Sequence, residues 1–179
     1  MIQQEFDAMP SLVVTLVGSD RPGLVGSVSD VIQKHNGNWR ESRMAHLAGQ
    51  FAGIMLVDVP EADTESLIGG LNLLSSQGLK VVTELDAART TEESAGAVWS
   101  VNVLGNDRPG IIRELTQTLA AHDVNVEELL TECNDAPHGG GQIFTAKAQL
   151  RLPEGLTIEF LQDELERLAT DLMIDFAAT

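Results

Sequence analysis

The sequence predicts an α+β protein of two similar units, each with the element order βαββαβ. Residues 17–25 recur in closely similar form as residues 104–112, and residues 51–60 recur as residues 144–153 after a short insertion in the second copy. Within each copy, short apolar runs typical of strands alternate with segments whose apolar residues recur at helical spacing. Such repetition is the pattern of a tandem duplication.

In the first copy, an apolar and β-branched run at residues 12–17 predicts a strand that ends at Gly18. A helix is expected next, because apolar residues recur at helical spacing from Leu24 until the stop signal at residues 35–37. The remaining expected elements are a hairpin of strands at 38–47 and 50–59 around Ala48-Gly49, a helix from about Thr64 to Ser76 capped by Gly78, and a strand at 79–85.

The second copy repeats this pattern with a longer hairpin. Its first strand and helix are predicted from alternating and helical apolar positions, which are Trp99, Val101 and Val103, then Ile111, Ile112, Leu115 and Leu119. The hairpin tip, residues 134–141, contains Pro137 and three consecutive glycines, so we expect a mobile loop. The final helix is marked by Leu161, Leu165, Leu168 and Leu172, and the last strand is expected at residues 173–176.

These elements place one domain at residues 8–86 and a second at residues 97–179, with a linker at residues 87–96 that lacks apolar periodicity. We expect each domain to be a four-stranded antiparallel sheet with two helices on one face. Domains of roughly 80 residues have modest cores and benefit from packing together. Because exposed strand edges recruit other chains, we also expect a homodimer.

The composition of the chain argues against several classes of function. The 27 acidic and 11 basic residues give a formal charge of −16, which argues against direct contact with nucleic acid. The one cysteine, Cys133, cannot form an internal disulfide or a thiolate metal site alone. No apolar run is long enough for a membrane span, and residues 1–7 lack the features of a signal peptide. We therefore expect a cytoplasmic protein without a metal or other cofactor and without a membrane partner.

The duplicated loop offers groups for both ends of an amino acid. Pro22 is expected at the first helical position, and Gly23 leaves the unpaired amides of the first turn unshielded for a carboxylate or phosphate. Asp20 can accept an α-ammonium group, and the Asn38 amide can both donate and accept. The candidate ligand-binding residues of the two copies are Asp20, Arg21, Gly23 and Asn38, and Asp107, Arg108, Gly110 and Asn125.

Each of these residues also has a purely structural explanation. Aspartate often caps a helix, Pro-Gly makes a turn, and asparagine after a helix satisfies local backbone groups, so a single copy does not decide between the two explanations. The arginines are expected to be mostly solvated. His35 and His122 match as helix C-terminal residues that can meet the last carbonyls. Neither His46 nor His138 has the spacing of a metal ligand, and Cys133 is interpreted as a structural thiol.

The Asp-Arg-Pro-Gly loop after a first strand, the amphipathic helix behind it and the asparagine opening the second strand resemble the ACT domain. That family is a ferredoxin-like βαββαβ regulatory module that commonly binds amino acids, and the resemblance covers nearly the whole chain twice. Residues 20–23, 41–44, Phe51 and 54–56 are further similar to the tandem ACT repressors of the glycine cleavage system. This resemblance implies a small amino acid such as glycine or serine as ligand, and a DNA-binding transcriptional activator as partner. In typical repressors of this kind the second loop is degenerate, whereas residues 106–110 are intact here.

Other functions of the βαββαβ order fit less well. An RNA-recognition domain needs exposed aromatic residues and basic charge, whereas only 4% of these residues are aromatic and none is tyrosine. A ferredoxin or metallochaperone of this fold needs more cysteines. ACT modules also accompany folate deformylases, so the alternative is a regulatory subunit or small enzyme of amino-acid or one-carbon metabolism. No catalytic domain fits in the remaining residues, and we therefore favour a sensor that is not an enzyme.

Overall fold

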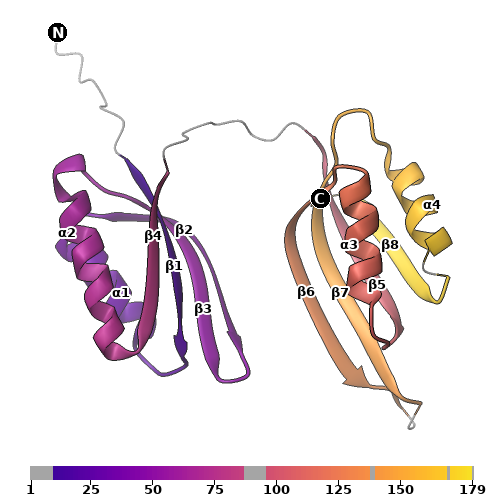
Figure 1. Ribbon diagram of the computed structural model, residues 1–179, viewed down its shortest axis with the longest axis horizontal. Helices are drawn as coiled ribbons and strands as arrows, with labels where there is room; N and C mark the ends of the chain where they lie inside the picture. Colours follow the sequence, from indigo (N-terminus) through magenta and orange to yellow (C-terminus); the bar gives the residue numbers. More distant parts are fainter. Residues whose placement is uncertain (1–9, 87–95, 138–139, 169, 179) are drawn as a thin grey trace. The chain divides into compact units, whose positions relative to one another are not determined.

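The computed structural model describes residues 10–86, 96–137, 140–168 and 170–178, which form two compact units (Figure 1). The first unit contains β1 (Ser11–Ser19), α1 (Leu24–Lys34), β2 (Asn38–Leu47), β3 (Gln50–Asp58), α2 (Glu61–Asn72), the 3₁₀ helix η1 (Leu73–Gln77) and β4 (Leu79–Asp86). The second contains β5 (Val98–Asn106), α3 (Ile111–Ala121), β6 (Asn125–Asp135), β7 (Gln142–Arg151), α4 (Ile158–Leu168) and β8 (Leu172–Ala178). All but the last residue of the predicted linker lies outside the described residues.

Both units have the predicted element order and the predicted antiparallel sheet. The strands follow the order β2-β3-β1-β4 in the first sheet and β6-β7-β5-β8 in the second. Strand register confirms how the two copies match, since Gly18 lies opposite Phe51 and Gly105 lies opposite Phe144. The duplication predicted from the sequence is therefore a duplication of the whole fold.

Several element boundaries differ from the prediction by a few residues. The helix predicted to reach Ser76 is divided into α2, which ends at Asn72, and η1. α2 begins at Glu61, directly after Pro60, because acidic residues in its first turn favour a helix start there. Leu172 starts β8 and does not belong to α4, which ends at Leu168. β6 continues through Asp135, which pairs with Gln142, so the hairpin tip is shorter than predicted. Part of that tip, residues 138–139, lies outside the described residues.

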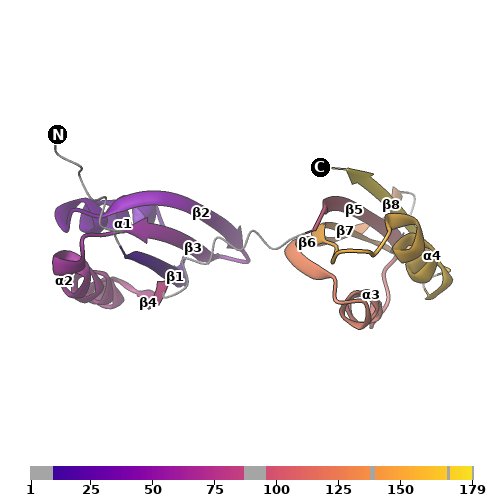
Figure 2. The ribbon, with the colours of Figure 1, turned by 90° about the horizontal axis from the view of Figure 1, so that it is seen from above.

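Each unit has its own apolar core between its sheet and its two helices. In β1, alternate residues face the helices and are fully buried, as the period of a strand requires. Figures 1 and 2 show that both helices of a unit lie on one face of its sheet, which leaves the opposite face uncovered. The buried apolar residues of β1, α1, β3 and α2 are Leu12, Val14, Leu16, Leu24, Val28, Ile32, Phe51, Met55, Val57, Leu67 and Leu71.

One ion pair is conserved in position between the copies but reversed in charge. In both sheets, the pairing of the edge strand with its neighbour shifts register at the same place, at Arg40 in β2 and at Glu127 in β6. Arg40 Nη1 pairs with the buried Asp58 carboxylate at 2.9 Å, and Arg151 pairs with Glu127 at the matching positions. Both ion pairs connect the start of an edge strand to the neighbouring strand. The two copies therefore have the same contact, made by different residues.

Candidate functional site

The loops after β1 and β5 enter their helices through a left-handed glycine. Gly23 has φ 90° and ψ −1°, Gly110 has φ 97° and ψ −6°, and each is the N-cap residue of the helix that follows. The prediction that Pro22 occupies the first helical position is wrong, because α1 begins at Leu24. Proline followed by a glycine of positive φ is typical of a type II turn, and this turn redirects the chain into the helix.

The glycine is required by its backbone conformation and not by crowding. A Cβ atom added at Gly23 would have no atom within 4 Å, but φ 90° is strained for any residue with a side chain. The first helical hydrogen bond of α1 runs from Ser27 N to Gly23 O, and no side-chain oxygen caps this helix. The amides of residues 24–26 therefore have no helical partner and are directed toward the loop.

The two loop aspartates are anchored by their backbones at the hairpin end of each sheet. Asp20 N donates to Gly49 O at 2.9 Å, and Asp107 N donates to Gln142 O at 2.8 Å. The Asp20 side chain is 44% exposed and lies 3.5 Å from His46 Nε2 of β2. The Asp20 carboxylate is therefore accessible to a ligand beside the entrance to α1.

In the second copy, Cys133 occupies the position that matches His46. Its thiol is exposed. Desolvation by neighbouring residues raises the pKa of the Cys133 thiol, and the charge and hydrogen bond of Asp107 raise it further. A raised pKa keeps the sulfur protonated at neutral pH, which disfavours a nucleophilic role.

Both arginines of the loops bind the turn that precedes the last strand of their unit. Arg21 Nη2 donates to Gln77 O at 3.0 Å. Arg108 makes two carboxylate contacts: Nε lies 2.6 Å from Asp171 Oδ2, and Nη1 and Nη2 lie 2.9 and 2.7 Å from the two oxygens of Glu114. The expectation of mostly solvated arginines therefore does not describe Arg108, which is bound on both sides.

Glu114 makes the two loops chemically different. It lies four residues after Gly110, in the first turn of α3, and Ser27 has the matching place in α1. α1 has no acidic residue in its first turn, and the Ser27 hydroxyl donates to Gly23 O at 3.1 Å. A carboxylate near the start of a helix offsets the helix dipole and repels a second anion. The first loop is thus the better carboxylate site.

Acid should weaken the second unit through this ion-pair cluster. Hydrogen bonds from Arg108 lower the pKa of Glu114 and of Asp171 below their usual values. Because both pKa values are lowered in the folded state, their stabilisation is complete above the unfolded values of about 4 and is lost as the pH falls through the folded values. Urea midpoints of the wild type and Arg108→Gln should therefore converge between pH 6 and pH 3. Parallel pH profiles for the two proteins would contradict this role of the cluster.

The structure does not bring Asn38 to the loop of its own copy. Asn38 lies opposite Asp58, which pairs with Ser11 at the start of β1, whereas Asp20 follows the end of β1. The nine residues of β1, at about 3.3 Å each, place the two side chains roughly 30 Å apart. Asn125 has the equivalent position in the second copy. One small ligand therefore cannot contact both the aspartate and the asparagine of a single copy.

The helix-terminal histidines contact the second helix of their unit. His35 and His122 are the C-cap residues of α1 and α3, as predicted. His35 Nδ1 lies 3.1 Å from Ser66 Oγ, and the His122 ring meets Phe160 edge-on at 5.2 Å. These contacts connect the helix pairs. Among the described residues, which exclude His138, no three potential metal ligands come together.

Two models of the ACT domain match the chain, over residues 11–84 and over residues 99–150. The chain belongs to the ACT domain family. Its two ACT domains are arranged in tandem, each a ferredoxin-like βαββαβ unit. The glycine cleavage system transcriptional repressor of Escherichia coli (strain K12) is 26% identical over 162 residues, which cover 90% of this chain and 85% of that protein.

Solved structures share the tandem ACT fold. The crystal structure of an unknown protein from Galdieria sulphuraria has a TM-score of 0.79 and 28% identity, and the match covers 96% of this chain and 99% of that one. A structure provisionally described as a glycine cleavage system transcriptional repressor has a TM-score of 0.69 and 22% identity, with the same coverage. Within the described residues of this ACT protein, no helix has the length and apolar character needed to cross a membrane.

Proposed function

We propose that this tandem ACT protein senses a small amino acid, such as glycine or serine, and regulates transcription through a DNA-binding activator without itself being an enzyme. Membership of the ACT family supports the amino-acid ligand. The similarity to the Escherichia coli repressor over 90% of the chain supports the regulatory role. The alternative is a regulatory subunit or small enzyme of amino-acid or one-carbon metabolism.

The observation that carries the ligand proposal is the uncapped start of α1 beside the exposed Asp20 carboxylate. Amides of residues 24–26 can receive the ligand carboxylate, and the aspartate can receive the α-ammonium group. In the second unit, the carboxylate of Glu114 lies in the first turn of α3, beside the matching helix start, where Arg108 pairs with it. The proposal is therefore one amino acid per chain, bound by the first loop.

Calorimetric titration with each of the twenty amino acids tests this proposal. Asp20→Ala should weaken binding of the ligand so identified by about 1.5–3 kcal/mol, the scale of a charge-assisted hydrogen bond. Asp107→Ala is the matched control and should leave the affinity unchanged, because the carboxylate of Glu114 beside the second loop repels a ligand carboxylate. Equal losses in both variants, or binding of none of the twenty amino acids, would contradict the proposal.

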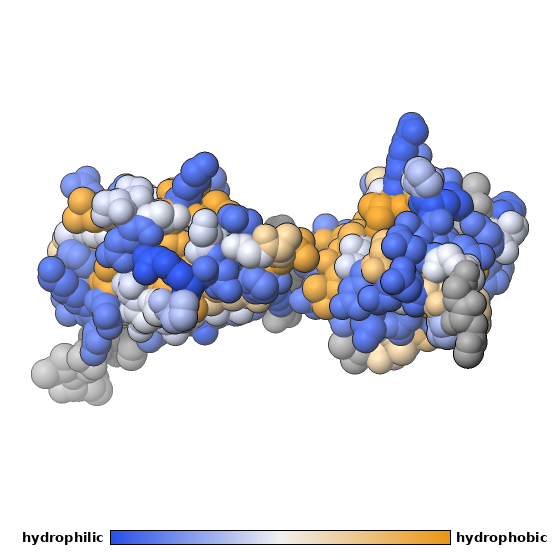
Figure 3. Space-filling view, turned by 90° about the horizontal axis from the view of Figure 1, so that it is seen from below, coloured by the Kyte–Doolittle hydropathy of each residue, from blue (hydrophilic) through white to orange (hydrophobic). Residues whose placement is uncertain are grey.

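The charge of the chain predicts that regulation does not pass through direct DNA contact. The formal charge is −16, and hydrophilic residues cover most of the surface visible in Figure 3. Because a phosphate backbone repels such a surface, we expect no measurable binding to duplex DNA at physiological salt. A gel shift with the protein alone that is specific and sensitive to salt would contradict the partner-mediated role.

A further inference from the structure

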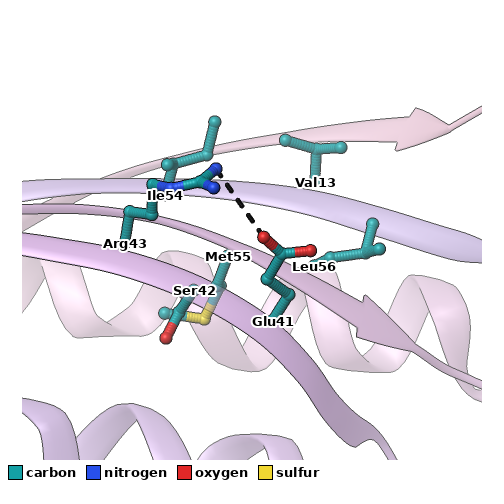
Figure 4. Close-up of a pocket in the computed structure, with 7 residues that line it drawn as sticks. All are labelled: Val13, Glu41, Ser42, Arg43, Ile54, Met55 and Leu56. Carbon is teal, nitrogen blue, oxygen red and sulfur yellow. Dashed lines mark ion pairs between the residues drawn. The ribbon is translucent and has the colours of Figure 1, made fainter. Parts of the chain in front are cut away.

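The helix-free face of the first sheet carries an apolar patch on its surface. Ile54 is 48% exposed and Val82 is 58% exposed, and both lie beside Thr15 in the same cross-strand row. Figure 4 shows Val13, Ile54 and Leu56 on the side opposite Ser42 and Met55, around a shallow pocket of about 190 Å³. We call this surface the open face of the first unit; its central apolar residues are Val13, Val17, Ile54, Leu56 and Val82, and Leu47 lies at its edge.

The second unit shows that the fold does not require apolar residues here. Strand register gives the matching positions of its open face, of which four are polar or charged and one, Leu104 in place of Val17, is apolar. The second open face also has exposed apolar residues at other positions, Leu130 and Met173. Lys147 stands for Ile54 and Asp175 for Val82, while Ser100 and Gln149 stand for Val13 and Leu56. A fold that tolerates lysine and aspartate at these positions gains no stability from exposing isoleucine and valine. An exposed apolar surface of this kind marks a contact with another molecule.

The charged residues beside the patch can pair with those of an identical patch on a second chain. On β4, Lys80 precedes Val82 by two residues and Glu84 follows it by two, and all three side chains share the open face. Two such faces can stack on each other about a two-fold axis that runs across the strands, along the row that contains Val82. In this arrangement, Lys80 of each chain lies opposite Glu84 of the other chain. On β2, each Arg43 lies near this axis and is paired with its own Glu41 at 3.6 Å.

We infer that the open face of the first unit binds the same face of a second copy of this chain, with the strands of the two sheets antiparallel across a two-fold interface. Sheets that pack face to face bury the side chains of both faces in one layer, which removes the apolar patch from water. A two-fold contact presents the same surface from both chains, and the Lys80 to Glu84 order meets this requirement. The interface uses no residue of the ligand-binding loop.

Light scattering across micromolar concentrations tests whether the open face of the first unit forms the dimer. Ile54→Lys introduces the residue that the second unit already carries, so the fold should survive while the dimer is lost. Leu130→Lys is the matched control, since Leu130 is an exposed apolar residue of the second unit's open face, and it should leave the dimer intact. A monomeric wild type, or a dimer that survives Ile54→Lys, would overturn the inference.

Charge reversal tests the geometry. K80E and E84K should each raise the dissociation constant of the homodimer roughly tenfold, because each places like charges opposite one another twice. An equal mixture of the two variants should dimerise like the wild type, since both pairs between positions 80 and 84 then have opposite charges. The double variant K80E/E84K should also dimerise with the dissociation constant of the wild type. A mixture no tighter than the separate variants would overturn the antiparallel arrangement.

Discussion

Ser27→Glu should abolish amino-acid binding by the first loop. The change places a carboxylate in the first turn of α1, where α3 has Glu114. Two negative charges about 5 Å apart in an effective dielectric of about 20 repel by about 3 kcal/mol, which lowers affinity more than a hundredfold. Calorimetry with the amino acid that binds the wild type measures the loss.

Two controls separate charge from shape. Ser27→Gln has nearly the size of the glutamate variant without its charge, and should retain most of the affinity. Glu114→Ser gives the second loop the residue of the first and frees one side of Arg108, so a second binding event should appear. Full binding by Ser27→Glu would show that the ligand carboxylate does not lie at the start of α1.

Leu67→Ala should destabilise the first unit by about 3 kcal/mol. Leu67 lies on α2 with 0% of its surface exposed, and deletion of its buried methyl groups leaves a cavity in the core. Leu73→Ala is the control, because Leu73 is 73% exposed on η1 and its loss should cost less than about 0.5 kcal/mol. Urea unfolding, followed by a probe in the first unit, measures both changes. Equal costs for the two variants would contradict the assignment of the core.

The fold could be predicted from the sequence because repetition and periodicity are local signals. The left-handed glycines were not predicted, because Pro22 was placed at the first helical position, although proline followed by glycine also indicates a turn of this kind. The end of α4 was missed because Leu172 continues the spacing of Leu165 and Leu168, although the helix has already ended. Periodicity reports which face a residue occupies and not whether the helix reaches it.

The candidate site was only partly predictable. The difference between Ser27 and Glu114 is visible when the copies are aligned, but the partner Asp171 lies 63 residues from Arg108 and has no sequence signal. The grouping of Asp20 with Asn38 was an error of topology. A strand, a helix and a second parallel strand return the chain to its starting end, so the start of β2 lies far from the end of β1.

Backbone amide chemical shifts during titration with the bound amino acid test the central claim most directly, because they report which helix start receives the carboxylate. The account predicts that the largest shifts fall on Leu24, Val25 and Gly26, with Asp20 also affected, while residues 111–113 remain unchanged. Shifts centred on residues 111–113, or away from both loops, would contradict it.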